Sequence, residues 1–185
     1  MSLFTRSKES KKNGFTSNRI RELCVFAMLG AVMFCSKILM EALPNIHLLG
    51  MLTMTYTIAF RRKALIPIYI CVFLNGVFAG FSLWWIPYLY IWTLLWGITM
   101  LLPRNMPEKI KKIVYPLVCA LYGLSFGTLY APAQALMFGF DLNQTLAWIA
   151  AGFPFDLIHA AGNLVAGFLI IPLSDLLVKL MQKKI

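Results

Sequence analysis

The sequence predicts an all-α integral membrane protein with six transmembrane helices and both termini in the cytoplasm. Composition is the first observation behind this prediction: of 185 residues, 60% are hydrophobic and 13% charged, and the mean hydropathy is +0.76. Soluble domains carry about 25% charged residues, and a water-soluble fold of this length could not bury so much apolar surface. The second observation is that long apolar segments alternate with short basic clusters.

The distribution of Lys and Arg predicts the topology. The net charge is +10, and all basic residues except Lys37 fall within residues 6–21, 61–63, 104–112 and 179–184. Lys and Arg mark cytoplasmic loops in membrane proteins. With six crossings every basic group is cytoplasmic, and the three remaining loops carry no Lys or Arg. We expect this charge to face anionic lipid or a cytoplasmic protein, not nucleic acid.

The first three spans follow from apolar runs that end at turn or charge signals. The first, residues 20–42, ends at EALPN, where Pro44 breaks the helix. The second, residues 46–60, stops at the basic RRK and has about 15 strongly apolar residues, fewer than the ~20 that cross a ~30 Å core untilted. The third, residues 64–81, ends at the turn GFS.

The last three spans are bounded in the same way. Residues 84–102 end at the proline-containing basic loop LPRNMPEKIKK, and residues 113–137 are followed by GFDLNQT. Residues 155–175 continue into an amphipathic end, SDLLVKLMQKK. The chain thus divides into a basic cytoplasmic tail, residues 1–19, and a membrane domain, residues 20–185.

The sequence indicates no cofactor and no nucleotide site. Its four cysteines stand singly in apolar segments, without the CxxC spacing of metal sites. It has no P-loop, so any energy from ATP has to come from partner proteins.

With this topology, the polar residues of the spans gather in their outer halves. They are Lys37, Glu41, His47, Asn75, Gln134, Asp156, His159 and Asn163. The inner halves hold little beyond threonine and tyrosine hydroxyls. The pattern predicts a polar cavity that is open to the outside and closed toward the cytoplasm.

Asp156, His159 and Asn163 share one helix face, because they are spaced i, i+3 and i+7. At 1.5 Å per residue they cover roughly 10 Å of depth. They either clamp the helix to its neighbours or face a bound polar solute. We favour the solute for the set as a whole, because ionisable residues inside a membrane are candidate functional sites.

Two further interpretations of the polar residues stay open. Asp156 and His159 could share a metal ion with His47 or Glu41 as a third ligand, as in an intramembrane metal-dependent enzyme. Lys37 and Glu41, four residues apart, could neutralise each other or hold a charged ligand group. A stand-alone facilitator is also conceivable, but the apolar inner halves disfavour it. We expect no catalytic residue and no resident metal.

An aromatic stripe and a small-residue face complete the pattern. Trp84, Tyr88, Trp92 and Trp96 recur every four residues, and such rings either form an interfacial belt or stack on a flat solute. Ala27, Gly30 and Ala31 form a small-xxx-small face, which lets another helix approach closely.

The chain resembles the substrate-binding S-components of energy-coupling factor (ECF) transporters, the vitamin importers of bacteria and archaea. The resemblance covers nearly the whole chain. It rests on the chain length, six spans with both ends inside, the basic N-terminal tail, Ala27-xxx-Ala31, and the late polar segment DLIHAAGN.

The resemblance implies an S-component-like bundle in the bacterial plasma membrane that captures a vitamin-like micronutrient without hydrolysing ATP. It implies docking, through the face of Ala27, Gly30 and Ala31, on a transmembrane T-component attached to two ATP-binding cassette ATPases. It also implies an outer pocket capped by the loop ALPNIH, residues 42–47.

Together, the residues and the resemblance predict a substrate site with polar and stacking groups. The polar groups are Asn75, Gln134, Asp156, His159 and Asn163, and the stacking or apolar groups are Trp92, Trp96 and Phe155. The aromatic stripe favours a ring-bearing solute such as a flavin, a corrinoid or a deazapurine.

Overall fold

The protein is entirely helical in the part of the chain that the structure describes. The structure is a computed structural model that describes residues 3–42 and 46–182, with side chains from residue 19 onward. Helices account for 86% of the residues, and the described part contains no strand. The predicted all-α class is confirmed.

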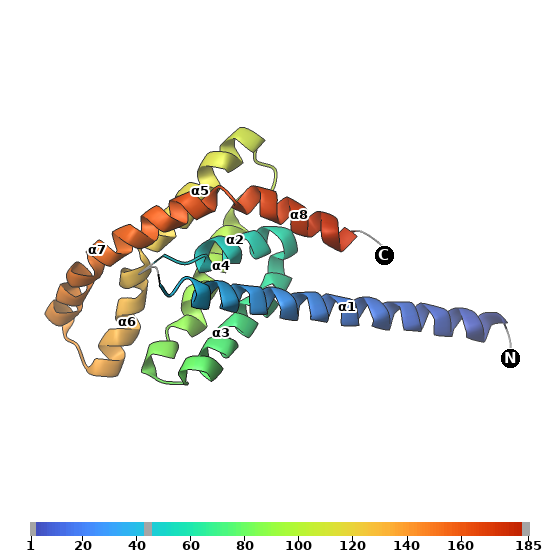
Figure 1. The fold of residues 1–185 in the computed structure, drawn as a ribbon, viewed down its shortest axis with the longest axis horizontal. Helices are drawn as coiled ribbons and strands as arrows, with labels where there is room; N and C mark the ends of the chain where they lie inside the picture. Colours follow the sequence, from blue (N-terminus) through green and yellow to red (C-terminus); the bar gives the residue numbers. More distant parts are fainter. Residues whose placement is uncertain (1–2, 43–45, 183–185) are drawn as a thin grey trace.

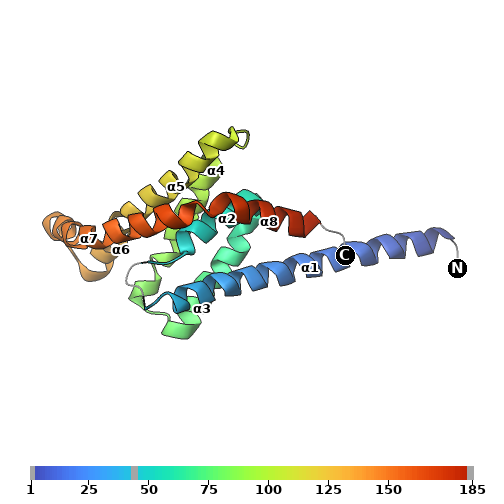
Figure 2. The ribbon, with the colours of Figure 1, turned by 45° about the horizontal axis from the view of Figure 1, so that its top comes forward.

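Eight α-helices build the described part of the fold (Figure 1). They are α1 (Leu3–Leu39), α2 (Leu49–Phe60), α3 (Leu65–Ala79), α4 (Tyr88–Leu101), α5 (Glu108–Leu124), α6 (Phe126–Phe138), α7 (Leu142–Gly167) and α8 (Ile170–Gln182). Short 3-10 helices, η1 (Arg61–Ala64) and η2 (Leu83–Trp85), precede α3 and α4. Helix α1 packs on α3, α7 packs on α5 and α6, and α8 packs on α2. Both ends of the chain lie on the same side of the molecule (Figures 1 and 2).

Four helical segments are long and apolar enough to cross a membrane. They are Arg19–Leu39, Leu49–Ala79, Glu108–Phe138 and Leu142–Gly167. The second contains η1 and the third contains the α5–α6 break. Helix α4 has 14 residues and is therefore about 21 Å long. Four apolar segments of this length are typical of a membrane protein, whereas six crossings and cytoplasmic termini remain predictions.

Two helices are longer than the sequence predicted. Helix α1 begins at Leu3 and so continues through the basic tail. Helix α7 begins at Leu142 instead of residue 155, because Asp141 and Gln144 form a capping box: the Gln144 amide donates to Asp141 Oδ1 (2.8 Å), and the Asp141 amide donates to Gln144 Oε1 (2.9 Å). Gly139, with φ of 68°, ends α6 in the left-handed conformation that glycine favours. The segment GFDLNQT therefore contains the tight turn after α6 and the first residues of α7.

The predicted fifth span is broken in the middle. Helix α5 ends at Leu124 and α6 begins at Phe126, with Ser125 between them. The Ser125 hydroxyl donates to the Tyr122 carbonyl at 3.0 Å. The break leaves backbone N–H groups at the start of α6 without partners in their own helix, inside an apolar segment.

Helix α2 is the centre of the core. Every residue from Leu49 to Thr57 is buried, and α2 contacts α1, α4, α5, α7 and α8. A helix that is covered on all sides needs no polar face, and α2 has no charged residue. Two of its three threonine hydroxyls bond within the helix: Thr57 Oγ1 donates to the Thr53 carbonyl at 2.6 Å, and Thr55 Oγ1 donates to Met51 Sδ at 3.4 Å.

Tyrosine hydroxyls connect the helices through backbone carbonyls. Five of them donate to a carbonyl of another helix: Tyr56 to Leu29, Tyr69 to Leu89, Tyr90 to Leu129, Tyr122 to Ile91 and Tyr130 to Trp84 in η2. Such bonds gain strength where little water competes for the carbonyl. The last three hold the α4 region against α5 and α6.

Close packing of α5 on α7 depends on the absence of a side chain at Gly123. A Cβ on Gly123 would lie 2.9 Å from the His159 carbonyl group and 2.7 Å from Asn163 Nδ2, whereas a Cβ on Gly97 of α4 would meet no atom within 4 Å. We expect Gly123→Ala to destabilise the protein by about 1–3 kcal/mol through overpacking. Gly97→Ala is expected to be neutral or stabilising by up to ~1 kcal/mol, because alanine favours helix. Thermal unfolding in detergent, followed by circular dichroism, distinguishes them, and equal melting temperatures would contradict the close approach.

Candidate functional site

The polar face of α7 points into the protein. Asp156, His159 and Asn163 are only 4%, 9% and 4% exposed. The predicted shared face is therefore present, and it lies against α2, α5 and α6. What each side chain contacts decides between the helix-clamp and solute interpretations.

Asp156 caps a neighbouring helix. Both of its carboxylate oxygens accept from the Gly127 N–H, at 3.0 and 3.1 Å, and Gly127 is the second residue of α6. The N-terminus of a helix carries unpaired donors and a partial positive charge, so a carboxylate there is stabilising. A Cβ on Gly127 would lie 2.5 Å from Asp156 Oδ2, so glycine makes room for the carboxylate.

Asn163 clamps α7 to two other helices. Its Nδ2 donates to the Cys119 carbonyl of α5 at 3.2 Å. Its amide also packs against Gly50 of α2, where an added Cβ would lie 3.2 Å from both amide heteroatoms. For Asp156 and Asn163, the helix-clamp interpretation describes the contacts.

His159 differs from its two neighbours because its Nδ1 has no hydrogen-bond partner among the described residues, although the atom is buried. The nearest carboxylate oxygen, Asp156 Oδ1, is 3.9 Å away, beyond hydrogen-bond distance. The His47 ring lies 5.1 Å from the His159 ring between centroids, and His47 Nδ1 is likewise buried without a partner in the described part of the chain. Two adjacent imidazoles therefore have unused polar atoms, and buried polar atoms normally have partners.

Aromatic rings surround the two histidines. We call the group His47, Tyr88, Trp92, Phe126, Tyr130 and His159 the aromatic–histidine cluster. The Trp92 centroid lies 5.9 Å from Tyr88, 6.1 Å from Phe126 and 6.3 Å from His47. Phe126 lies 5.1 Å from His159 and 6.1 Å from Tyr130. The cluster draws on the start of the α2 region, α4, α6 and α7.

The remaining predicted site residues are not among the six residues of this cluster. Trp96 donates its ring N–H to the Arg61 carbonyl at 3.1 Å, toward the basic η1 turn. Phe155 is 54% exposed, because one residue rotates it about 100° from Asp156. Asn75 is buried, but its amide donates to the Cys71 carbonyl of its own helix. Gln134 is half-buried on α6.

Sequence reasoning missed Phe126 and Tyr130, and it placed His47 in the outer polar group, in the lid and as a possible metal ligand, but not among the substrate-binding residues. Nothing in the sequence marks Phe126, because its position depends on the helix break at Ser125. His47 could have been found by pairing the only two histidines of the chain.

Two interpretations left open by the sequence can be compared with the structure: the pairing of Lys37 with Glu41, and a metal site at His159. Lys37 Nζ lies 3.6 Å from Glu41 Oε1, so these two residues pair with each other. Within the described residues no group of three His, Cys, Asp or Glu side chains could hold a metal ion. His47 does lie beside His159, but the Asp156 oxygens are directed to the Gly127 amide.

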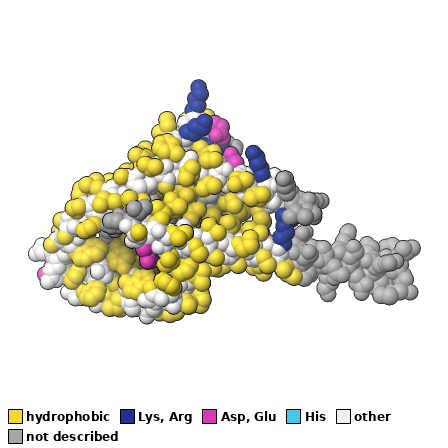
Figure 3. Space-filling view, in the orientation of Figure 1, with side chains coloured by type: hydrophobic (Ala, Val, Ile, Leu, Met, Phe, Trp, Pro, Cys, Tyr) yellow, Lys and Arg dark blue, Asp and Glu magenta, His cyan; other side chains and the backbone are white. Residues whose placement is uncertain are grey.

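The surface of the protein is hollowed on the side away from the N-terminal end of α1 (Figure 3). Residues 43–45 are the centre of the predicted ALPNIH lid, and they lie outside the described residues.

The small-residue face of α1 is only partly exposed. Ala27 is exposed and Ala31 half-buried. Gly30 instead faces α3, where a Cβ would lie 2.6 Å from the Ile70 side chain. Gly30 thus serves the internal packing of α1 on α3, and the exposed part of the predicted docking face is Ala27 with the edge of Ala31.

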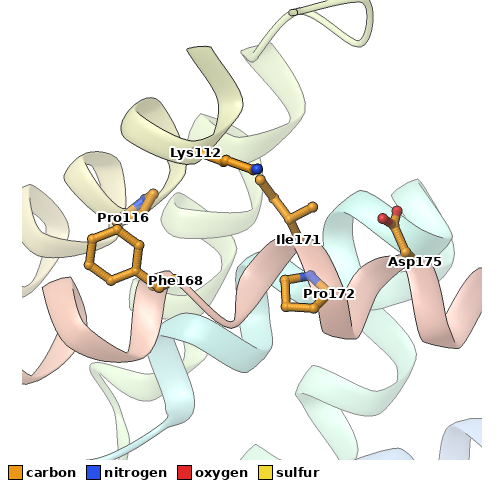
Figure 4. Close-up of a pocket in the computed structure, with 7 residues that line it drawn as sticks. Lys112, Pro116, Phe168, Ile171, Pro172 and Asp175 are labelled. Atoms are coloured by element: carbon orange, nitrogen blue, oxygen red, sulfur yellow. The ribbon is translucent and has the colours of Figure 1, made fainter. Parts of the chain in front are cut away.

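A separate cavity of about 480 Å³ lies between α5 and the junction of α7 with α8. Figure 4 shows Ile171 and Pro172 between Lys112 of α5 and Asp175 of α8, with Pro116 and Phe168 at the opposite end of the cavity from Asp175. It contains no residue of the aromatic–histidine cluster, so we treat the two as distinct.

Comparisons of the chain with protein-family models, with curated proteins and with solved structures found no match. Functional interpretation therefore depends on the residues and geometry described above.

The Asp156 cap predicts a graded response to substitution. Asp156→Ala leaves the Gly127 N–H without a partner and removes the charge at the start of α6, so we expect a loss of about 1–3 kcal/mol. Asp156→Asn keeps an acceptor oxygen and should lose less than half of that. Asp175→Ala, at an exposed carboxylate, is the control and should change little. Unfolding in mixed micelles measures all three, and equal effects at both positions would exclude the cap.

Proposed function

We propose that this protein is a membrane-embedded binding protein that captures a small ring-bearing solute at the aromatic–histidine cluster. The observation that carries the proposal is the pair of buried imidazole nitrogens on His47 and His159, which lack partners among the described residues and are set among aromatic rings. Small-molecule sites have this composition: an apolar, aromatic lining with a few convergent polar groups.

The chemistry of the cluster favours a planar solute with a hydrogen-bonding edge. A neutral imidazole has one donor and one acceptor nitrogen, so two imidazoles can match a ring that presents both. Trp92, Phe126 and Tyr88 supply flat surfaces for stacking. Among vitamin-like compounds, flavins and deazapurines have such an edge on a conjugated ring.

For the membrane arrangement we propose six crossings, made by α1, α2, α3, α4, the α5–α6 pair, and α7. Both termini would then lie in the cytoplasm, and their position on the same side of the molecule agrees with this (Figures 1 and 2). Basic side chains gather at the α4–α5 turn and toward the terminal ends of α1 and α8, away from the hollow (Figure 3). By the positive-inside rule the hollow then faces outward.

For energy coupling we propose the role of an S-component of an ECF-type importer in a bacterial plasma membrane. The proposal follows the resemblance of the sequence and the lack of a P-loop in it. A T-component with two ATPases would drive release of the solute inward. The exposed Ala27 on α1 supports a smooth docking surface for that partner.

The binding proposal is tested by removing the imidazole nitrogens while keeping the ring. Mass spectrometry of the purified protein first identifies a co-purifying compound, and calorimetry then measures its affinity. We expect His159→Phe and His47→Phe each to weaken binding about tenfold or more, the equivalent of one lost hydrogen bond in a dry site. Phe155→Ala is the matched control, because Phe155 is on α7 but exposed. Unchanged affinity in both histidine variants would rule out the cluster as the site.

The coupling proposal is tested on α1. We expect Ala27→Trp and Ala31→Trp to abolish uptake in cells that contain the ATPase module, with solute binding retained, because the bulky ring blocks close helix approach. Val32→Trp is the control: Val32 is also exposed on α1 but lies on a different part of its circumference. Uptake that survives both alanine substitutions would contradict docking through this face.

A further inference from the structure

A second pocket, of about 300 Å³, lies where η1, the end of α4 and the start of α5 meet. Three basic residues line it, Arg61, Arg104 and Lys111, each from a different segment. Ile58 and Leu102 supply apolar lining, and Tyr115 a phenol ring. None of these residues belongs to the aromatic–histidine cluster.

The positive charge of this pocket is only partly neutralised by the protein. Lys111 pairs with Glu108, Nζ to Oε1, at 3.1 Å. Arg61 Nη2 donates to the Met100 carbonyl at 3.1 Å, but its Nε is buried without a partner among the described residues. Arg104 has no acidic partner in the described part of the chain. Unneutralised guanidinium groups around one pocket favour the binding of an anion.

The backbone of Arg61 supports a specific role for its side chain. Arg61 has φ of 56° and ψ of −120°, and it is the one described residue other than glycine with positive φ. Residues other than glycine rarely adopt this backbone conformation, because it is strained. Strained residues of this kind cluster at functional positions. The Trp96 ring N–H bonded to its carbonyl, and its own N–H bonded to the Thr57 carbonyl, hold it there. Glycine would fit this turn with less strain, yet the chain has arginine.

We propose that the pocket binds the phosphate group of an anionic lipid at the basic end of the molecule. Guanidinium groups bind phosphate oxygens in pairs, and lysine adds a point charge. The apolar residues Ile58 and Leu102 favour a lipid over a free phosphate, and the neighbouring Leu101 is 85% exposed, so an acyl chain has apolar surface beside the headgroup. The assignment is independent of the solute site.

The experiment compares two double variants that each remove two positive charges. Arg104→Gln with Lys111→Gln changes the pocket, and Arg62→Gln with Lys109→Gln changes exposed residues that do not line it. The full-length protein in detergent is titrated with phosphatidylglycerol, and native mass spectrometry counts the bound lipid. We expect one retained phosphatidylglycerol in the wild type and in the control, and about a tenfold lower affinity in the pocket variant. A single variant, Arg61→Gly, should weaken binding similarly, and glycine accepts the positive φ, so misfolding does not explain its loss.

Two further measurements distinguish a lipid phosphate from a free phosphate ion as the ligand of the pocket. Inorganic phosphate at millimolar concentration should not displace the lipid, and phosphatidylcholine, which has no net charge, should bind more weakly. Displacement by inorganic phosphate, with loss of phosphate binding in the pocket variant, would overturn the lipid and assign the pocket to a free phosphate. Equal lipid loss in the two double variants would reject the pocket altogether, because general surface charge would then explain binding.

Discussion

The contact between the Asp156 carboxylate and the start of α6 is the interaction that fixes the interior arrangement. A helix that restarts at Phe126 inside an apolar segment exposes N–H groups that lipid and aliphatic side chains cannot satisfy. Asp156 satisfies the Gly127 amide from a different helix. This contact fixes α7 against α6 and thereby sets the depth of His159, which stands one turn further along α7. The bonds of Asp156 and Asn163 hold His159 in place, while His159 Nδ1 has no hydrogen-bond partner among the described residues.

The polar face of α7 combines two structural contacts with the histidine on which the proposed binding site depends. Asp156 and Asn163, at the two ends of the face, bond to backbone groups of α6 and α5. His159 lies between them, beside the rings of His47 and Phe126. The bonds of Asp156 and Asn163 keep α7 from rotating, so the imidazole of His159 stays beside these rings. The proposed binding role of His159 depends on this fixed position.

The sequence predicts what depends on composition and local periodicity. Apolar spans, basic clusters and the i, i+3, i+7 spacing are sufficient for the helical class and for the shared face of α7. Contacts between segments could not be predicted: Trp96 and Phe155 are expected at the site from their neighbours in sequence, but helix rotation and the position of η1 direct them elsewhere. Phe126 joins the site only through the break at Ser125, and a single serine in an apolar run is a weak signal for such a break. The late start predicted for the last span misses the capping box of Asp141.

The burial of α2 also has a consequence for the order in which the chain assembles. At 12 residues, or about 18 Å, α2 is too short to span a ~30 Å hydrocarbon core without distortion while lipid surrounds it. Its final neighbours include α4, α5 and α8, which the ribosome makes later. The second helix to be synthesised is thus among the last to reach its final environment, and α8 completes the enclosure. A nascent chain halted before residue 170 would already contain α2, but without α8 its core would still be open.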